Sequence, residues 1–362
     1  MTLATDSMAT TFGAGVRTGS SSARERIQPE RLVSSQATTA GWRQKYLTQF
    51  GDQPNSYFHL QAGVNHFSVP GVGFLTYFSQ WVLTARTHIV FARPVCSDSD
   101  VGPLLDAFMS QVKGRFIFAG MDAATAELLR VRGFCVNEFG VDFTIPLSGY
   151  VVQGKEMKYL RTVLNNAKKG VEIRELRWDE VDGAAVERIS NAWRGTKAVK
   201  KRELKLLTRP PQFRDEWAVR KFFCFKDGRV VGFVFFDPFF KDGRTIGYTA
   251  NILRSEPDVK PRGILDFCIL TAMDKFREEG VELVSLGCAP LHDIQPHAHE
   301  RPRLRQILQF AHERGNALYS FKDLAFHKTR YRARETKLYG CVGRDSNDFL
   351  TVWAALRATN TL

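Results

Sequence analysis

Two Asp-Gly dipeptides, each set between apolar runs, restrict the fold of this chain more than any other feature. They are Asp227-Gly228 and Asp242-Gly243. Asp-Gly in this setting is typical of a tight β-hairpin, because the turn needs a left-handed backbone that glycine adopts without steric cost. The two turns therefore predict three consecutive antiparallel strands, at residues 218–225, 230–236 and 245–253.

The segments around these hairpins predict an alternation of helices and strands. Apolar positions recur with a helical period in residues 155–169, 179–193, 263–279 and 303–314. Short apolar strands are expected at residues 172–176, 282–286 and 338–342. Three antiparallel strands followed by helix, strand, helix and strand match the element order of the acetyltransferase-like α/β fold.

The first half of the chain repeats a weaker version of this order. Strands are expected at residues 57–61, 73–78, 88–92, 115–119 and 136–145, with helices at 101–112 and 123–132. The expected fold class is α/β (α+β), with two tandem acetyltransferase-like (GNAT-type) units and mixed sheets flanked by helices. The predicted divisions are a disordered tail at 1–40, a first unit at 41–150, a second, basic catalytic unit at 151–345 and a C-terminal helix at 346–362.

The net charge of the chain is concentrated in the second half. Residues 1–150 contain 12 Lys+Arg against 11 Asp+Glu, whereas residues 151–362 contain 39 against 27. Such an excess is not needed for folding and costs self-repulsion, so it indicates an anionic partner. Nucleic acid, an anionic membrane and a phosphorylated substrate all fit this charge.

The cysteines and the apolar runs favour a cytoplasmic protein. The six cysteines are scattered and contain no Cys-x-x-Cys pair, as expected for free thiols in a reducing compartment. No apolar run approaches the roughly 20 residues of a membrane helix, and residues 1–40 lack the apolar segment of a secretory signal. We therefore expect at most peripheral contact with the inner face of a membrane.

The loop in which this fold usually holds acetyl-CoA is poorly suited to a pyrophosphate. Such a loop needs closely spaced glycines, so that backbone N–H groups approach the phosphates at a helix N-terminus. Residues 254–263 contain one glycine, two prolines without N–H and two carboxylates, so no CoA or other cofactor is expected. His292, His297 and His299 resemble zinc ligands, but no cysteine is suitably spaced and no metal is expected.

Eight phenylalanines in residues 222–240 resemble a lipid-binding platform at first sight. Strand alternation buries at least half of such a set, so a core role is the better interpretation. Phe239 and Phe240, beside a turn, are the two whose exposure stays open.

Three ordered segments carry a resemblance to a known family. They are residues 154–170, with Gly154-Lys155, Arg161, Asn165, Lys168 and Gly170; residues 285–291; and residues 319–331, which end in Lys328-x-Arg330-Tyr331. In this order and spacing, residues 40–342 resemble the C-terminal catalytic domain of the phosphatidylglycerol lysyltransferase family, the aminoacyl-phosphatidylglycerol synthases. The resemblance implies two acetyltransferase-like units and transfer of an aminoacyl group from aminoacyl-tRNA to a hydroxyl, typically on phosphatidylglycerol. Some relatives use other acceptors, including sterols and small natural-product precursors.

The resemblance implies a catalytic set of Asn251, Arg254, Asp266 and Lys328. Arg254 matches the arginine of an expected Asp-x-x-Arg at a strand end, but Asn251 stands where the carboxylate is expected. Because asparagine orients a hydroxyl or amino group but is not a base, the identity of the base stays open. Asp266 matches a family carboxylate, and a helix-start residue favourable to the helix dipole is an equally open interpretation.

The resemblance also implies a substrate-binding set of Glu203, Arg209, Arg330, Asn316 and Tyr319. Lys328 and Arg330 are expected to contact a donor phosphate or the reacting carbonyl. A solvated ionic loop explains Glu203 and Arg209 equally well, and packing is the first interpretation of Tyr319.

Three functions remain open from the sequence. The first is aminoacyl transfer from aminoacyl-tRNA to a hydroxyl acceptor, with phosphatidylglycerol preferred as that acceptor. The second uses the same donor with a small soluble acceptor, which the unexpected Asn251 favours. The third is a non-catalytic protein that binds RNA or a membrane. Convergence of Arg254, Asp266, Lys328 and Arg330 on one pocket distinguishes the enzymes from the binding protein.

Overall fold

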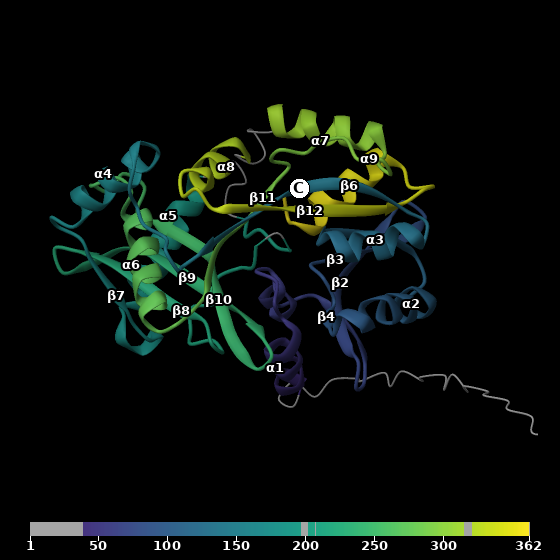
Figure 1. The fold of residues 1–362 in the computed structure, drawn as a ribbon, viewed down its shortest axis with the longest axis horizontal. Helices are drawn as coiled ribbons and strands as arrows, with labels where there is room; N and C mark the ends of the chain where they lie inside the picture. The colour runs from purple at the N-terminus through teal and green to yellow at the C-terminus, as the bar shows by residue number, and fades with distance from the viewer. Residues whose placement is uncertain (1–38, 197–201, 207, 315–320, 362) are drawn as a thin grey trace, which may run out of the picture. The chain divides into compact units, whose positions relative to one another are not determined.

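The computed structural model describes residues 39–196, 202–206, 208–314 and 321–361, and Figure 1 shows their arrangement. Asn316 and Tyr319, both expected to bind substrate, lie outside the described residues. The expected tail also lies outside them, except for residues 39 and 40, with which the first helix begins.

The strands of the described residues form one mixed sheet of twelve strands. They are β1 (Asn65–Val69), β2 (Gly73–Val82), β3 (Ala85–Phe91), β4 (Val95–Cys96), β5 (Arg115–Met121), β6 (Phe134–Pro146), β7 (Glu172–Glu175), β8 (Arg220–Lys226), β9 (Arg229–Lys241), β10 (Arg244–Ser255), β11 (Leu283–Pro290) and β12 (Arg334–Gly343). Their order is β1-β2-β3-β5-β12-β6-β11-β10-β9-β8-β7, with β4 beside β2. β3 pairs with β5 in parallel, as does β10 with β11, and the other pairs are antiparallel.

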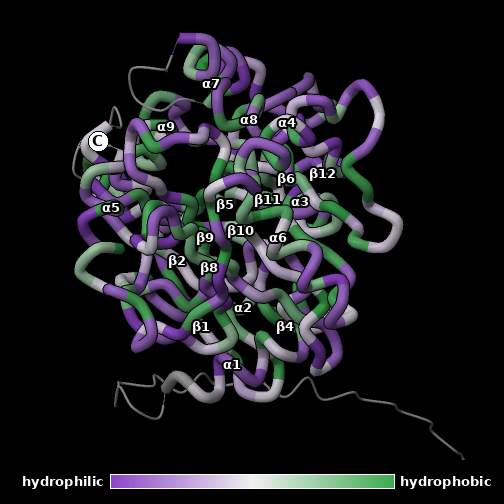
Figure 2. The backbone as a smooth tube through the Cα atoms, turned by 90° about the vertical axis from the view of Figure 1, so that its left-hand side faces the viewer, coloured by the Kyte–Doolittle hydropathy of each residue, from purple (hydrophilic) through white to green (hydrophobic). Residues whose placement is uncertain are grey.

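Helices flank the sheet, as expected for the acetyltransferase-like class, and this fold class is confirmed. They are α1 (Thr39–Phe50), α2 (Val101–Gln111), α3 (Ala123–Val131), α4 (Lys158–Ala167), α5 (Gly183–Gly195), α6 (Ile264–Glu278), α7 (Pro302–Arg314), α8 (Phe321–Thr329) and α9 (Asp348–Ala358). Short 3₁₀ turns lie at Ser56–Leu60, Asp98–Asp100, Lys155–Met157 and Trp178–Glu180. In Figure 2 the outer helix α7 is largely hydrophilic, whereas apolar stretches concentrate in the strands.

Both expected hairpins are present. Asp227 and Gly228 join β8 to β9 with φ angles of 49° and 75°, and Asp242 and Gly243 join β9 to β10 with 49° and 82°. These left-handed angles are the ones the Asp-Gly pairs favour. β9 continues past residue 236, where the sequence predicted its end. A strand tolerates a proline such as Pro238 at an edge where no partner strand needs its backbone N–H. β8 pairs only up to Phe236, so the far part of β9 has one edge without a partner strand.

The phenylalanines of β8 and β9 alternate between the two faces of the sheet. Phe222 and Phe236 pack on Phe276 of α6, with ring centroids 5.6 and 5.2 Å apart. On the opposite face Phe223, Phe233 and Phe235 pack with Val186 and Ile189 of α5. The core interpretation therefore holds for this set.

Phe239 and Phe240, whose exposure the sequence left open, belong to the core. Both side chains are buried, at 1% and 4% exposure. Phe240 stacks on Trp217, with ring centroids 5.0 Å apart, and its backbone N–H donates to the carbonyl of Gly51 just after α1. The segment after α1 therefore covers the end of β9, which the sequence around residue 240 does not indicate.

The two halves of the chain exchange strands at the centre of the sheet. β6, the last strand before residue 150, lies between β12 and β11, and β12, the last strand of the chain, lies between β5 and β6. The long β6 pairs with β12 along Phe134–Thr144 and with β11 along Gly140–Pro146. Each half therefore completes the sheet of the other. A domain division near Tyr150 remains a prediction.

Candidate functional site

The candidate pocket opens where β10 and β11 part. These parallel neighbours pair from Gly247 with Leu283 to Thr249 with Ser285. The residues that follow on both strands, 250–254 and 286–288, line a pocket of about 410 Å³. Residues 323–328 of α8, the end of α5 and residues 202–209 supply further lining side chains. The divergence of two neighbouring strands therefore leaves a space that side chains from five separate segments surround.

Arg254 and Glu203 form an ion pair in the wall of the pocket. The Nη1 and Nη2 atoms of Arg254 lie 3.0 and 2.6 Å from the two carboxylate oxygens of Glu203. Arg254 also donates to the hydroxyl of Ser190, and its guanidinium lies 4.8 Å from the ring centroid of Trp193. A bidentate pair with this support fixes both side chains. Glu203 is therefore held in the pocket wall and is not free in a solvated loop.

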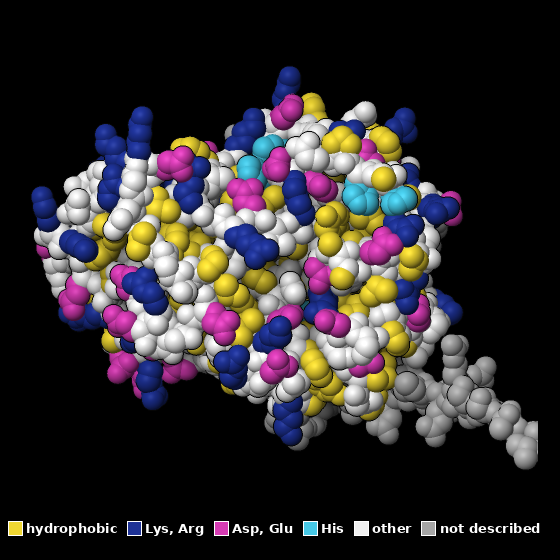
Figure 3. Space-filling model, in the orientation of Figure 1, with side chains coloured by type: hydrophobic (Ala, Val, Ile, Leu, Met, Phe, Trp, Pro, Cys, Tyr) yellow, Lys and Arg dark blue, Asp and Glu magenta, His cyan; other side chains and the backbone are white. Residues whose placement is uncertain are grey.

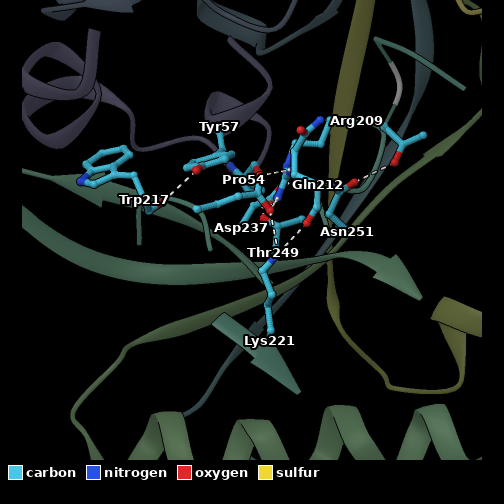
Figure 4. Close-up of polar contacts among 11 residues, drawn as sticks. Pro54, Tyr57, Arg209, Gln212, Trp217, Lys221, Asp237, Thr249 and Asn251 are labelled. Atoms are coloured by element: carbon cyan, nitrogen blue, oxygen red, sulfur yellow. Dashed lines mark hydrogen bonds and ion pairs between the residues drawn. The ribbon is translucent and has the colours of Figure 1, made fainter. Parts of the chain in front are cut away.

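Asn251 lies at a β-bulge in β10, where the register with β9 shifts between Ala250 and Ile252. Its Nδ2 donates to Asp237 at 2.9 Å, and its Oδ1 accepts a hydrogen bond from Thr208 at 2.8 Å. Figure 4 shows Asn251, Asp237 and Arg209 turned toward one another. Bulges are common beside functional sites because they re-aim a side chain. Here the bulge places Asn251 on the pocket lining with both ends of its amide engaged.

Behind Asn251 lies a buried cluster of two cations and two carboxylates. Arg209 forms two hydrogen bonds to Asp237, at 2.8 and 2.6 Å, and contacts Glu216 at 2.6 Å. Lys221 contacts Glu216 at 3.0 Å. Because Asp237 has no exposed surface, burial raises the pKa of its carboxyl, and the Arg209 guanidinium opposes that rise. The charges balance only if residue 251 is neutral, which an asparagine satisfies.

Lys328 is a buried cation at the pocket. Its side chain is 6% exposed, and its Nζ donates to the backbone carbonyl of Cys288 at 2.7 Å. Burial lowers the pKa of Lys328 to about 8, against the opposing effects of Cys288 and Asp142. Its ammonium has three donors, so two stay available beyond the Cys288 contact.

Asp266 does not line the pocket but lies directly behind it. This carboxylate, in the first turn of α6, accepts a hydrogen bond from the Tyr331 hydroxyl at 2.7 Å and lies 2.9 Å from Nε2 of His327. Burial alone would raise the pKa of Asp266, but His327 and Tyr331 hold it below the ordinary value. His327 itself lines the pocket.

Arg330 lies outside the pocket lining. Its guanidinium stacks over the Tyr159 ring of α4 at 4.0 Å and lies 5.4 Å from the Phe326 ring, which is 67% exposed. Exposed lysines lie on α4 and directly before and after it; they are Lys155, Lys158, Lys168 and Lys169. Figure 3 shows Lys and Arg side chains projecting at the upper left, where Figure 1 places α4.

The structure thus brings together five of the nine expected site residues. Asn251, Arg254, Lys328, Glu203 and Arg209 line one pocket. Asp266 lies behind His327 and Arg330 lies outside the pocket lining. Asn316 and Tyr319 are outside the described residues. Sequence reasoning missed His327, Thr208 and Asp237. His327 and Tyr331 lie on and just after α8 with ring centroids 5.8 Å apart, but their four-residue spacing in the sequence did not single out either residue as a site residue.

Across residues 39–361, wherever the structure describes them, no three His, Cys, Asp or Glu side chains are grouped so as to hold a metal. In the same part of the chain, no helix has the length and apolar character needed to cross a bilayer.

The splayed strands and the flanking helices define the acetyltransferase-like fold class. The family model for the C-terminal region of phosphatidylglycerol lysyltransferase matches residues 43–342, and this chain belongs to that family. The resemblance read from the sequence is therefore confirmed. No curated protein matches the chain.

Solved structures show the same fold. The chain is similar to the C-terminal domain of a lysylphosphatidylglycerol synthetase from Agrobacterium fabrum, at 20% identity and a TM-score of 0.71, covering 88% of this chain and 96% of that one. It is similar to L-PGS from Bacillus licheniformis at 18% identity and a TM-score of 0.71, covering 88% and 95%. FemX matches at 9% identity and a TM-score of 0.51, covering 83% and 95%.

Proposed function

We propose that this chain transfers an aminoacyl group from aminoacyl-tRNA to a hydroxyl acceptor, with the glycerol hydroxyl of phosphatidylglycerol preferred. The observation that carries the proposal is the pocket, which joins Asn251, Arg254 and Lys328 with Glu203 from a separate segment. Family membership supports the class of reaction. Aminoacyl-tRNA as donor and phosphatidylglycerol as acceptor are our own extension to this chain.

The reaction is a transesterification, in which the acceptor hydroxyl attacks the ester carbon and the ribose hydroxyl of the tRNA leaves. It needs a positioned acceptor, removal of a proton and a cation where the oxyanion develops. Lys328 suits the last task, because its buried ammonium has unused donors beside the pocket. Arg254 is held by Glu203 and Ser190. We therefore assign Arg254 the role of holding Glu203 and the pocket wall in place.

The basic surface outside the pocket suits the donor. Arg330 follows α8, the helix that supplies Lys328 to the pocket, and stacks on Tyr159 of α4, a helix that carries exposed lysines. Phosphate contacts of this kind supply most of the affinity of nucleic-acid binding. Because the acceptor lipid is also anionic, the same surface suits peripheral contact with a membrane at its cytoplasmic face.

A small soluble acceptor is the second candidate. The observation in its favour is Asn251, whose amide is engaged at both ends and stands where a carboxylate is expected. A non-catalytic binding role is less well supported, because Arg254 and Lys328 line one pocket instead of being scattered over the surface.

The test incubates the purified protein with labelled aminoacyl-tRNAs and vesicles that contain phosphatidylglycerol, and then measures which fraction gains label. Label in the lipid fraction is the expected result. Label only in a water-soluble product, after addition of a cell extract, selects the second candidate. Absence of transfer from every aminoacyl-tRNA, with tRNA binding retained, leaves the binding role.

A further inference from the structure

His327 is the titratable side chain of the pocket that the reaction above does not yet use. It projects from the last turn of α8, lines the pocket and has 29% of its side chain exposed. Its Nε2 lies 2.9 Å from Oδ1 of Asp266, and the same oxygen accepts a hydrogen bond from Tyr331. The arrangement is a pocket histidine backed by a buried carboxylate, which is in turn fixed by a buried phenol.

The contact with Asp266 determines which ring nitrogen carries the proton. An ionised carboxylate only accepts hydrogen bonds, so the Nε2 that faces it must be protonated. In the neutral ring Nδ1 is then unprotonated and has a free lone pair. A carboxylate behind a histidine thus sets the tautomer and stabilises the imidazolium that forms when the ring takes a proton.

Four other polar residues at or behind the pocket supply a base less readily than His327. Asn251 has no basic atom, and Asp237 is fully buried in an ion pair with Arg209. Lys328 donates a hydrogen bond to the Cys288 carbonyl and is used as a cation in the proposed reaction. The carboxylate of Glu203 is paired to Arg254 through both oxygens.

We propose that His327 is the general base of this site and that Asp266 and Tyr331 are its positioning residues. The inference rests on the proposed function. In the step, the acceptor hydroxyl gives its proton to Nδ1 of His327 as its oxygen bonds to the ester carbon. The bond from that carbon to the ribose oxygen of the tRNA then breaks, and the imidazolium returns the proton to the departing oxygen. The histidine ends unchanged, and no other reactant is needed.

The first test compares His327→Gln with a matched control, His299→Gln, an exposed histidine outside the pocket. Loss of a general base typically lowers the rate by about a hundredfold or more, so His327→Gln is expected to lose at least that much in kcat. His299→Gln is expected to match the wild type. Thermal melting of both variants separates loss of the base from loss of the fold. A folded His327→Gln variant with wild-type kcat overturns the proposal.

The split between kcat and KM tests the positioning role of Asp266. Asp266 lies behind His327 and does not line the pocket, so it does not contact a bound substrate there. Asp266→Asn removes the carboxylate that sets the tautomer of His327, and we expect a lower kcat with a KM near the wild-type value. Asp266→Glu supplies a carboxylate again and is expected to recover part of the rate. A folded Asp266→Asn variant with wild-type kcat contradicts the positioning role.

A measurement without turnover separates this inference from the proposed function. Long-range ¹H–¹⁵N spectra of the labelled full-length protein, assigned with His327→Gln, report the tautomer of His327 directly. We expect the Nε2–H tautomer in the wild type and a mixed one in Asp266→Asn. An Nδ1–H tautomer in the wild type overturns the role of His327 even if transfer occurs. If the wild type transfers nothing, the proposed function fails and the base role fails with it, whatever the tautomer.

Discussion

The side-chain nitrogen of Asn251 lies 2.9 Å from a carboxylate oxygen of Asp237, a buried residue that already pairs with Arg209. The cluster behind it contains two cations and two carboxylates, closed by Lys221 and Glu216. A carboxylate at position 251 would face Asp237 without a cation of its own. The asparagine is therefore the residue type that suits this cluster, although it removes an expected base.

Asn251→Asp is expected to lower the free energy of unfolding by about 1–3 kcal/mol at pH 8, because two carboxylates in contact do not both ionise readily. The variant pair retains a proton, so the carboxyl pKa in the folded state is raised. A raised carboxyl pKa costs stability above the unfolded value of about 4, and the cost disappears as the pH falls toward it. Urea unfolding of variant and wild type between pH 8 and pH 4 checks this. The double variant Asn251→Asp with Asp237→Asn is expected to recover part of the loss, and an equal loss at both pH values contradicts the explanation.

Lys328→Met is expected to flatten the stability of the protein between pH 8 and pH 10. In the folded protein the pKa of Lys328 is lowered to about 8, whereas the unfolded chain has the ordinary value of 10.5. In this window the unfolded state binds more protons than the folded state, so stability rises with pH. Methionine has a similar shape and no charge, and removes that rise. Urea unfolding across the window tests this, with Lys322→Met, an exposed lysine on the same helix, as the control. A rise that survives in Lys328→Met places the titrating group elsewhere.

Arg330→Gln is expected to weaken tRNA binding and to reduce the salt dependence of its affinity. Each lost phosphate contact lowers the slope of log K against log salt by about 0.7 to 0.9. Filter binding with one aminoacyl-tRNA over a salt series measures the slope. Arg115→Gln changes an exposed arginine at the start of β5, in the other half of the chain, and is expected to keep the wild-type slope. An unchanged slope in Arg330→Gln removes this residue from the donor surface.

Separate fragments of residues 1–150 and 151–362 are each expected to fold poorly, and together to assemble. The reason is the exchange of β6 and β12, since each fragment lacks a strand that lies inside its part of the sheet. A sheet that loses an internal strand exposes unpaired backbone and apolar side chains. Circular dichroism and NMR dispersion of each fragment, alone and mixed, test this. Two well-folded fragments that do not associate contradict it.

The sequence predicted the features of the fold and the site that depend on neighbouring residues. The Asp-Gly turns set both hairpins, because the left-handed angles at Gly228 and Gly243 are a property of the turn itself. Motif order led to Arg254 and Lys328, which the structure then places on one pocket.

The features that the sequence did not predict depend on contacts between segments that are distant in the chain. The position of β12 beside β5 follows from sheet register, which residues 338–342 do not encode on their own. His327 becomes notable only when α6 brings Asp266 within 2.9 Å of its ring. The exposure of Phe240 stayed open because nothing in its neighbourhood indicates that the segment after α1 covers it.

The parting of β10 and β11 has a consequence for recognition. Beyond Thr249 and Ser285 the two strands no longer pair with each other. At the gap, side chains engage part of the backbone of β11, because Lys328 donates to the Cys288 carbonyl and the Gly287 N–H donates to the Ser285 hydroxyl. A ligand that enters the gap therefore meets side chains of α8 and of residues 250–254 in place of a neighbouring strand. Substitutions of these side chains are free to change which ligand is bound while the rest of the sheet stays paired.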